Sequence, residues 1–135
     1  MTADLDAAEA QATRELEGYL ARAYARYSDF QVAAAVADER GRVHYGVNVE
    51  NAAYPVGNCA EPTAIGAMIT AGGTQVKRVF LTASKVDDIT PCGGCRQRIA
   101  EFADKACEVV TIKGGKVIAR TTIGELLPNS FALLD

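Results

Sequence analysis

Two short motifs contain side chains that could do chemistry: Cys59–Glu61 (CAE) and Pro91–Cys95 (PCGGC). Together they hold three of the 4 cysteines of the chain and one carboxylate. Zinc in a catalytic site takes three protein ligands and leaves a fourth position for water, whereas structural zinc usually has four protein ligands. A carboxylate that lies near the metal without binding it can carry protons. The motifs therefore predict a catalytic zinc site with three cysteine ligands and Glu61 as the proton carrier.

Both motifs are predicted at the starts of helices. The run over 59–71 ends at two glycines and is typical of a helix, and a second helix is predicted over 94–103. Helix N-termini carry unpaired amide donors and a partial positive charge, which stabilise the thiolate form that a metal requires. We therefore expect Cys59 from one helix to meet Cys92 and Cys95 from the other.

The same residues allow other interpretations. A C-x-x-C motif at a helix start is also typical of a thioredoxin-like redox pair, which would need Cys92 and Cys95 free of metal. Cys107, at the start of a predicted strand, is expected to be an ordinary buried thiol. As a fourth ligand, however, it would close a purely structural zinc site. His44, the 1 histidine, alternates along a predicted strand and is expected to be a packing or surface residue rather than a metal ligand.

The rest of the pattern predicts a single α/β domain, residues 1–135, with the element order α-β-β-α-β-α-β-β. Besides the two motif helices, the predicted elements are an amphipathic helix over 4–25, strands over 31–37 and 43–49 in a hairpin, a loop over 51–58, a strand over 75–83, a loop over 85–91, strands over 107–112 and 117–122, and a short turn or helix over 123–127. We expect a three-layer α/β/α sandwich with a mixed five-stranded sheet.

Composition limits the kinds of protein that the chain can be. Its 135 residues are 49% hydrophobic and 23% charged, which suits one globular domain. The N-terminus is acidic where a signal peptide would be basic, and no run of eighteen apolar residues exists, so we expect a cytoplasmic protein with no membrane segment. The net charge of -3 and the lack of a Lys and Arg cluster disfavour a nucleic-acid partner. In a reducing cytosol, the 4 cysteines favour metal or redox chemistry over disulfides.

Several segments carry a resemblance to a known family. In chain order they are Tyr27–Val32 (YSDFQV), Asn48–Ala52 (NVENA), Cys59–Glu61, Pro91–Gln97 (PCGGCRQ) and Glu125–Pro128 (ELLP). On these motifs the chain resembles, from about Tyr27 to Phe131, the cytidine deaminase family in its short, homotetrameric, zinc-dependent type. The resemblance implies hydrolysis of cytidine and 2'-deoxycytidine to uridine and 2'-deoxyuridine, with release of ammonia, in pyrimidine salvage. A different or modified cytosine-like nucleoside, such as an antibiotic, is the alternative substrate.

The resemblance also implies roles for individual residues. The three motif cysteines would bind one zinc ion per subunit, and Glu61 would be the proton shuttle. Asn48 and Glu50 would bind the ribose hydroxyl, which is sensible because an amide and a carboxylate offer both donors and acceptors. The side chain of Phe30 would line the base pocket. The backbones of Ala60 and Thr90 would read the edge of the pyrimidine.

The family's short members are homotetramers, and two aromatic residues match positions that contribute across a subunit boundary. These residues are Tyr54 and Phe131. A chain this short has little surface with which to enclose a nucleoside, so we expect a homotetramer whose pockets are completed by neighbouring subunits.

Three positions depart from the family's pattern. Gln31 and Ala33 replace a Pro and a Gly, which bears on strand entry and pocket shape. Pro62 stands where members with three cysteine ligands typically have Arg, directly after the catalytic Glu61. Zinc with three thiolates beside a carboxylate is negatively charged, so the site needs a compensating positive charge. We expect the remaining amide groups of the helix N-termini to supply it together with Arg96, which can donate hydrogen bonds toward the thiolates.

Overall fold

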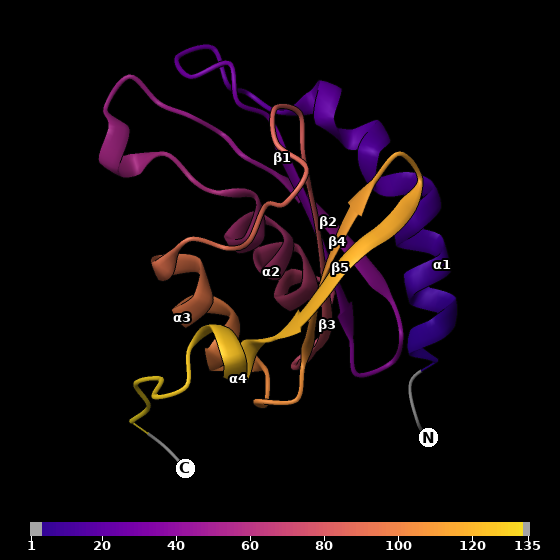
Figure 1. The fold of residues 1–135 in the computed structure, drawn as a ribbon. Coiled ribbons are helices and arrows are strands. Elements are labelled where there is room, and N and C mark those ends of the chain that lie inside the picture. Colours follow the sequence, from indigo (N-terminus) through magenta and orange to yellow (C-terminus); the bar gives the residue numbers. More distant parts are fainter. Residues whose placement is uncertain (1–3, 134–135) are drawn as a thin grey trace.

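A five-stranded sheet with helices on both faces forms the protein in a computed structural model, which describes residues 4–133 (Figure 1). The strands lie in the order β2-β1-β3-β4-β5, with β3 and β4 parallel and the other neighbours antiparallel. Their bounds are β1 Val32–Asp38, β2 Val43–Val47, β3 Val76–Ala83, β4 Glu108–Lys113 and β5 Lys116–Thr122. The predicted mixed sheet is confirmed. The predicted domain 1–135 extends at both ends beyond the described residues.

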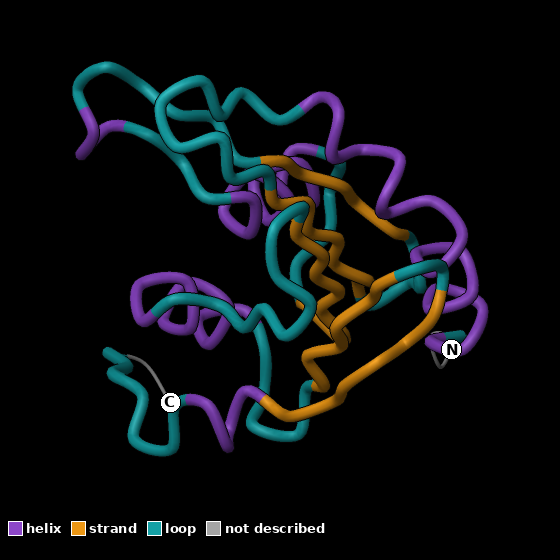
Figure 2. The backbone as a smooth tube through the Cα atoms, turned by 45° about the horizontal axis from the view of Figure 1, so that its top comes forward, coloured by secondary structure: helices purple, strands orange, loops and turns teal. Residues whose placement is uncertain are grey.

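Helices cover the two faces of the sheet separately (Figure 2). One face packs against α1, Leu5–Glu15, and the 3-10 helix η1, Leu16–Arg22. The other packs against α2, Ala60–Thr70, and α3, Gly93–Phe102, with the short α4, Ile123–Leu126, beside them. The three-layer α/β/α sandwich is therefore confirmed. None of the helices between residues 4 and 133 is both long and apolar enough to cross a bilayer.

The strand β1, which lies between β2 and β3, is buried on both faces and has small side chains. Ala33, Ala35 and Ala37 face the α1 side, whereas Ala34 and Val36 face the α2 side. All of these side chains are fully buried. Successive side chains of a strand point to opposite faces, so this short run contributes to both hydrophobic cores.

Two predicted elements differ from the structure in detail. The predicted helix over 4–25 is α-helical only to Glu15 and continues as η1. This 3-10 segment contains Gly18, a poor helix former, and the Glu17 carboxylate accepts hydrogen bonds from two backbone N–H groups of the β4–β5 turn. The predicted strand over 43–49 ends at Val47, and the loop after it contains a further 3-10 turn, η2, Tyr54–Val56.

Strand direction places the starts of α2 and α3 at the same edge of the sheet. β1 runs antiparallel to both β2 and β3, so β2 and β3 run in the same direction. A loop and then α2 follow β2, and a loop and then α3 follow β3. Both helices pack into the same hydrophobic core. Their N-termini therefore converge, as the cysteine motifs require.

Helix α2 packs very close to β2 at Gly46. A Cβ on Gly46 would lie 2.4 Å from the backbone nitrogen of Ala64 and 2.5 Å from the carbonyl oxygen of Ala60. These contacts are with helix backbone, which cannot move aside as a flexible side chain would. Glycine is needed here for space, and its contact sets how close the first turn of α2 lies to the sheet.

We expect Gly46→Ala to lower the free energy of unfolding by about 1–3 kcal/mol, the usual range for overpacking. The displaced first turn of α2 should also weaken zinc retention. Denaturant unfolding and metal analysis measure both effects. Gly66→Ala is the matched control, because Gly66 is an exposed residue of α2 where an added Cβ would meet no atom within 4 Å, and it should gain up to about 1 kcal/mol. Equal stability of the two variants would contradict the close-packing argument.

Candidate active site

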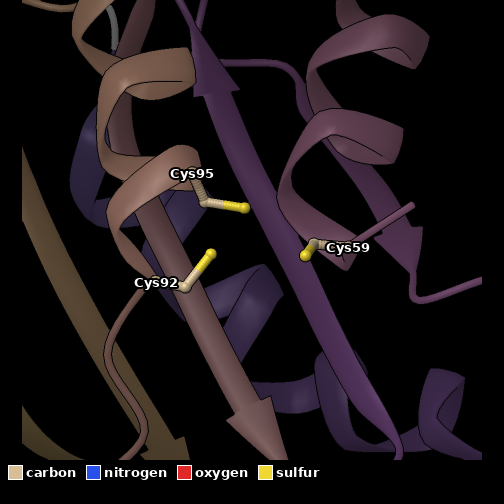
Figure 3. Close-up of side chains that lie close together, drawn as sticks. All are labelled: Cys59, Cys92 and Cys95. Atoms are coloured by element: carbon tan, nitrogen blue, oxygen red, sulfur yellow. The ribbon is translucent and has the colours of Figure 1, made fainter. Parts of the chain in front are cut away.

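Three cysteine sulfurs gather where α2 and α3 begin (Figure 3). Cys59 is the N-cap residue of α2, Cys92 is the N-cap residue of α3, and Cys95 lies in the first turn of α3. The three Sγ atoms all lie within 4.8 Å of one another. Cys95 is buried, whereas Cys59 and Cys92 are exposed, so the cluster is open to solvent on one side. The predicted meeting of the two motifs is confirmed.

The donor set fits a zinc ion. With Zn–S bonds of about 2.3 Å and tetrahedral angles, two sulfur ligands lie roughly 3.8 Å apart. The sulfurs here lie within 4.8 Å of one another, so small side-chain adjustments bring them to ligand distances. Three thiolates leave the fourth tetrahedral position for water or substrate, as in catalytic zinc sites.

The local environment acts differently on the three thiols. Burial raises the pKa of the Cys59 and Cys95 thiols. The pKa of the Cys92 thiol is lowered, chiefly by the backbone N–H of Cys95. The start of α3 therefore makes the Cys92 thiol easier to ionise than the other two, whose burial opposes ionisation until a metal binds. Metal binding should release protons and weaken as the pH falls.

Pro62 occupies the third position of α2. The side chain of an N-cap residue often accepts a hydrogen bond from the backbone N–H at this position. Proline has no backbone N–H to donate. The Cys59 side chain makes no capping hydrogen bond, and neither does Cys92 at the start of α3. The Cys59 sulfur is thus left free for a metal, but α2 has lost one amide that could stabilise negative charge.

Glu61 lies in the first turn of α2 and is only 4% exposed. Burial raises the pKa of its carboxyl group, while its own backbone N–H, the Cys95 thiol and the Arg98 guanidinium act in the opposite direction. A carboxyl group with a raised pKa is suited to exchange protons near neutral pH. Among the described residues, the three sulfurs form a group of closely spaced atoms that could hold a metal, and Glu61 is not part of it. The Glu61 carboxyl group lies beside this cluster, next to the Cys95 thiol.

A cleft of about 430 Å³ opens beside Cys59, a size that suits a small-molecule ligand. The segment 48–59 forms most of its wall, and Tyr27 and Ser28 form the rest. The lining residues are Tyr27, Ser28, Asn48, Val49, Glu50, Asn51, Tyr54, Gly57, Asn58 and Cys59. The cleft thus brings the predicted substrate residues Asn48, Glu50 and Tyr54 together with one predicted zinc ligand.

Asn48 and Glu50 also hold the cleft wall in place. The Glu50 carboxylate accepts hydrogen bonds from the backbone N–H groups of Tyr27 and Ser28, at 3.0 and 3.1 Å, and from the Ser28 hydroxyl. The Ser28 side chain is the largest cause of a lowered pKa for this carboxyl group. The Asn48 amide donates to the carbonyl oxygen of Phe30 at 2.8 Å and accepts from the N–H of Val32 at 2.9 Å.

Four predicted substrate residues do not line the cleft. Phe30 is half-buried, and its carbonyl oxygen is bound by Asn48. Ala60 is fully buried at the start of α2, and Thr90 is exposed in the loop before α3. Phe131 lies in the C-terminal segment, where Gln97 holds its backbone by two hydrogen bonds. The roles of these residues remain predictions.

The structure corrects the expectation for Arg96. Its guanidinium donates to the carbonyl oxygens of Pro91, at 2.7 Å, and Leu126, at 3.0 Å, and reaches the Thr90 hydroxyl at 3.5 Å. No hydrogen bond from Arg96 to a thiol is present among the described residues. Arg96 instead ties the loop before α3 to the end of α4.

Sequence reasoning missed Arg98. Its Nη1 lies 3.6 Å from the sulfur of Cys95, within hydrogen-bond reach of sulfur. Residues three apart on a helix are neighbours on its surface, so the i, i+3 spacing from Cys95 was a signal that could have found it.

The two remaining candidate ligands lie outside the cluster. Cys107 is a buried free thiol whose pKa is raised to about 12, mainly by burial, and it is not part of the three-sulfur group. His44 lies on β2, with its Nε2 2.8 Å from a carboxylate oxygen of the buried Asp38. A four-cysteine structural site therefore has no support in the geometry of the described residues.

Comparisons with known proteins agree with this geometry. Residues 8–111 match the sequence model for the cytidine and deoxycytidylate deaminase zinc-binding region. The chain belongs to this deaminase family. A cytidine deaminase from Sporosarcina psychrophila is 40% identical over 116 residues, which is 84% of each chain. A crystal structure of cytidine deaminase from Burkholderia pseudomallei superposes with a TM-score of 0.80 at 36% identity, covering 90% of this chain and 97% of that one.

A further relative within the deaminase family has a different name. A blasticidin-S deaminase from Bacillus cereus is 30% identical over 108 residues, 74% of this chain and 76% of its own length. All three clustered cysteines fall within the matched zinc-binding region. The family match and the three sulfurs together identify zinc as the metal of this site.

We expect Cys92→Ala to lose zinc, because two thiolates and water bind the ion far more weakly than three thiolates do. Metal analysis after purification and dialysis measures the loss. Cys107→Ser is the matched control and should keep its zinc, since Cys107 lies outside the cluster. Full zinc retention by the Cys92 variant would overturn the ligand assignment.

Proposed function

We propose that the protein hydrolyses cytidine and 2'-deoxycytidine to uridine and 2'-deoxyuridine and releases ammonia. The observation that carries this proposal is the three-sulfur cluster, one of whose sulfurs belongs to Cys59, a residue that lines the cleft, with the buried Glu61 in the first turn of α2. Asn48 and Glu50 line the same cleft and offer polar atoms to a sugar. A metal site next to a pocket with sugar-binding groups suits a nucleoside whose base reaches the metal.

Zinc, when bound, supplies a Lewis acid that makes a water molecule acidic near neutral pH. We propose that Glu61 moves the protons of the reaction. Its carboxylate takes a proton from the attacking water and gives it to N3 of the cytosine ring as oxygen adds at C4. It then takes the remaining proton of the new C4 hydroxyl and gives it to the amino group, so that the C4–N bond breaks, ammonia leaves and C4 becomes a carbonyl. Burial of Glu61 supports this role, because a raised pKa makes both directions of transfer accessible.

The cleft favours an uncharged nucleoside over a nucleotide. Its lining contains the Glu50 carboxylate and no Lys or Arg side chain. A phosphate group would therefore meet a negative charge with no cation to balance it. The modified nucleoside remains the alternative substrate, and the blasticidin-S deaminase relative is the observation that favours keeping it.

Activity on a substrate panel tests the proposed function. Zinc content and the loss of cytidine absorbance are measured on the same preparation, with 2'-deoxycytidine, cytidine 5'-monophosphate and blasticidin S as the other substrates. We expect turnover of both unmodified nucleosides with kcat/KM at least about tenfold above that for the monophosphate. Turnover of blasticidin S alone would replace the proposed substrate, and zinc without turnover of any substrate would reject it.

We expect Glu61→Gln to keep zinc and lose about 10²–10⁴-fold in kcat, the usual contribution of a positioned general acid–base. The amide is nearly isosteric but cannot exchange the protons. Stopped assays with cytidine and metal analysis give the two readouts. Glu101→Gln, an exposed change on α3, is the control and should behave as wild type. Loss of zinc from the Glu61 variant would mean that this carboxylate is a ligand.

We also propose a cytoplasmic homotetramer that acts in pyrimidine salvage. Two large aromatic side chains support the assembly because they are unusually exposed in a single chain: Tyr54 is 75% exposed and Phe131 is 68% exposed. Tyr54 also lines the cleft, so a neighbour packed on it would complete the wall. Light scattering should give four times the 14.3 kDa chain mass, and a fully active monomer would refute the assembly.

A further inference from the structure

The zinc site has a charge that the first turn of α2 does not balance. Three thiolates outweigh the charge of one divalent ion, and the Glu61 carboxyl group lies beside them. Pro62, the residue that follows Glu61, offers neither a cation nor an amide N–H. Some other group must offset the negative charge if the bound water is to remain acidic.

Arg98 is an exposed residue of α3 whose guanidinium reaches one sulfur of the cluster, that of Cys95. Its side chain runs back toward the helix N-terminus, as long helical side chains do, and its Nη1 lies 3.6 Å from the Cys95 sulfur. The guanidinium reaches back as far as Gly94, since a Cβ added to Gly94 would lie 3.4 Å from Nη1 of Arg98. The guanidinium therefore lies over the first turn of α3.

A cation is unfavourable at this place unless anions hold it there. The N-terminus of a helix carries a partial positive charge, which repels a guanidinium. Within residues 4–133, no carboxylate forms an ion pair with Arg98, and its one side-chain hydrogen bond is the contact with Cys95. By contrast, the Arg78 and Arg120 guanidinium groups both pair with Glu9. The interaction that can hold Arg98 over the helix start is thus with the sulfur cluster and Glu61.

We propose that Arg98 is a positioning residue of the zinc site and supplies the positive charge that Pro62 cannot. A donor on the Cys95 sulfur reduces its electron donation to the metal and offsets the negative charge of the three thiolates. The inference rests on the proposed zinc deaminase function. The compensating positive charge then comes from Arg98 on α3, whereas an arginine at position 62 of α2 could otherwise provide it.

Zinc affinity of Arg98 variants tests the assignment independently of activity. Competition with a chromophoric chelator should show that Arg98→Gln binds zinc about 10–100-fold more weakly, the usual effect of removing a partner of a metal ligand. Arg98→Lys keeps the charge and should lose less. Arg40→Gln, an exposed change in the turn between β1 and β2, has the same change in net charge and should match wild type.

The Co²⁺-loaded protein gives a second readout that general destabilisation would not produce. Thiolate-to-cobalt charge-transfer absorption depends on the electron donation of the sulfurs, so it should shift in Arg98→Gln and stay unchanged in Arg40→Gln. An unshifted band together with wild-type zinc affinity in Arg98→Gln would overturn the proposal. Equal weakening by Arg40→Gln would also overturn it, because the effect would then be one of net charge alone.

A double-mutant cycle tests whether positions 62 and 98 serve the same charge. Pro62→Arg should increase zinc affinity more in the Arg98→Gln background than in the wild type, since in the wild type the charge is already balanced. If the effects of the two substitutions on zinc affinity were strictly additive, the inference that an arginine at position 62 can replace Arg98 would be overturned. If wild-type protein neither holds zinc nor deaminates cytidine, the proposed function fails; if it does both and the Arg98 variants match it, only this inference fails.

Discussion

The common direction of β2 and β3 is the constraint on which the site depends. Because β1 lies between them and runs antiparallel to both, the helices that follow these strands begin at one edge of the sheet. Both helices bury their apolar side chains in one core, so their N-termini are held together by the packing of the whole fold. The glycine at position 46 lets α2 approach β2 closely enough for Cys59 to meet the α3 cysteines.

The environment of the cluster shifts the pKa values of its neighbouring groups in different directions. The start of α3 lowers the pKa of Cys92, whereas burial opposes ionisation of Cys59, Cys95 and Glu61. A bound metal overcomes that cost for the two thiols, since a ligand must be deprotonated. The Glu61 carboxyl group stays outside the ligand set, and the same burial then suits it to proton transfer.

The cleft wall and the proposed sugar-binding groups are parts of one structure. Glu50 holds the backbone at Tyr27 and Ser28, and Asn48 connects Phe30 to the start of β1. These hydrogen bonds involve both carboxylate oxygens of Glu50 and both amide atoms of Asn48, and the two side chains still line the cleft with hydrogen-bonding capacity left. Changes at either residue should therefore affect both the shape of the pocket and the binding of a nucleoside.

The sequence by itself determined the zinc-type motifs, the helix starts that carry them and the mixed α/β sheet, because each of these depends on local spacing and periodicity. Only the tertiary structure decided which groups surround the sulfurs. Arg96 and Arg98 are two positions apart on one helix, so their side chains leave it about 200° apart. The packing of α3 on the sheet turns Arg98 toward the thiols and Arg96 toward the carbonyl oxygens of Pro91 and Leu126. The rotation of a helix about its axis depends on contacts with distant segments, which no local pattern specifies.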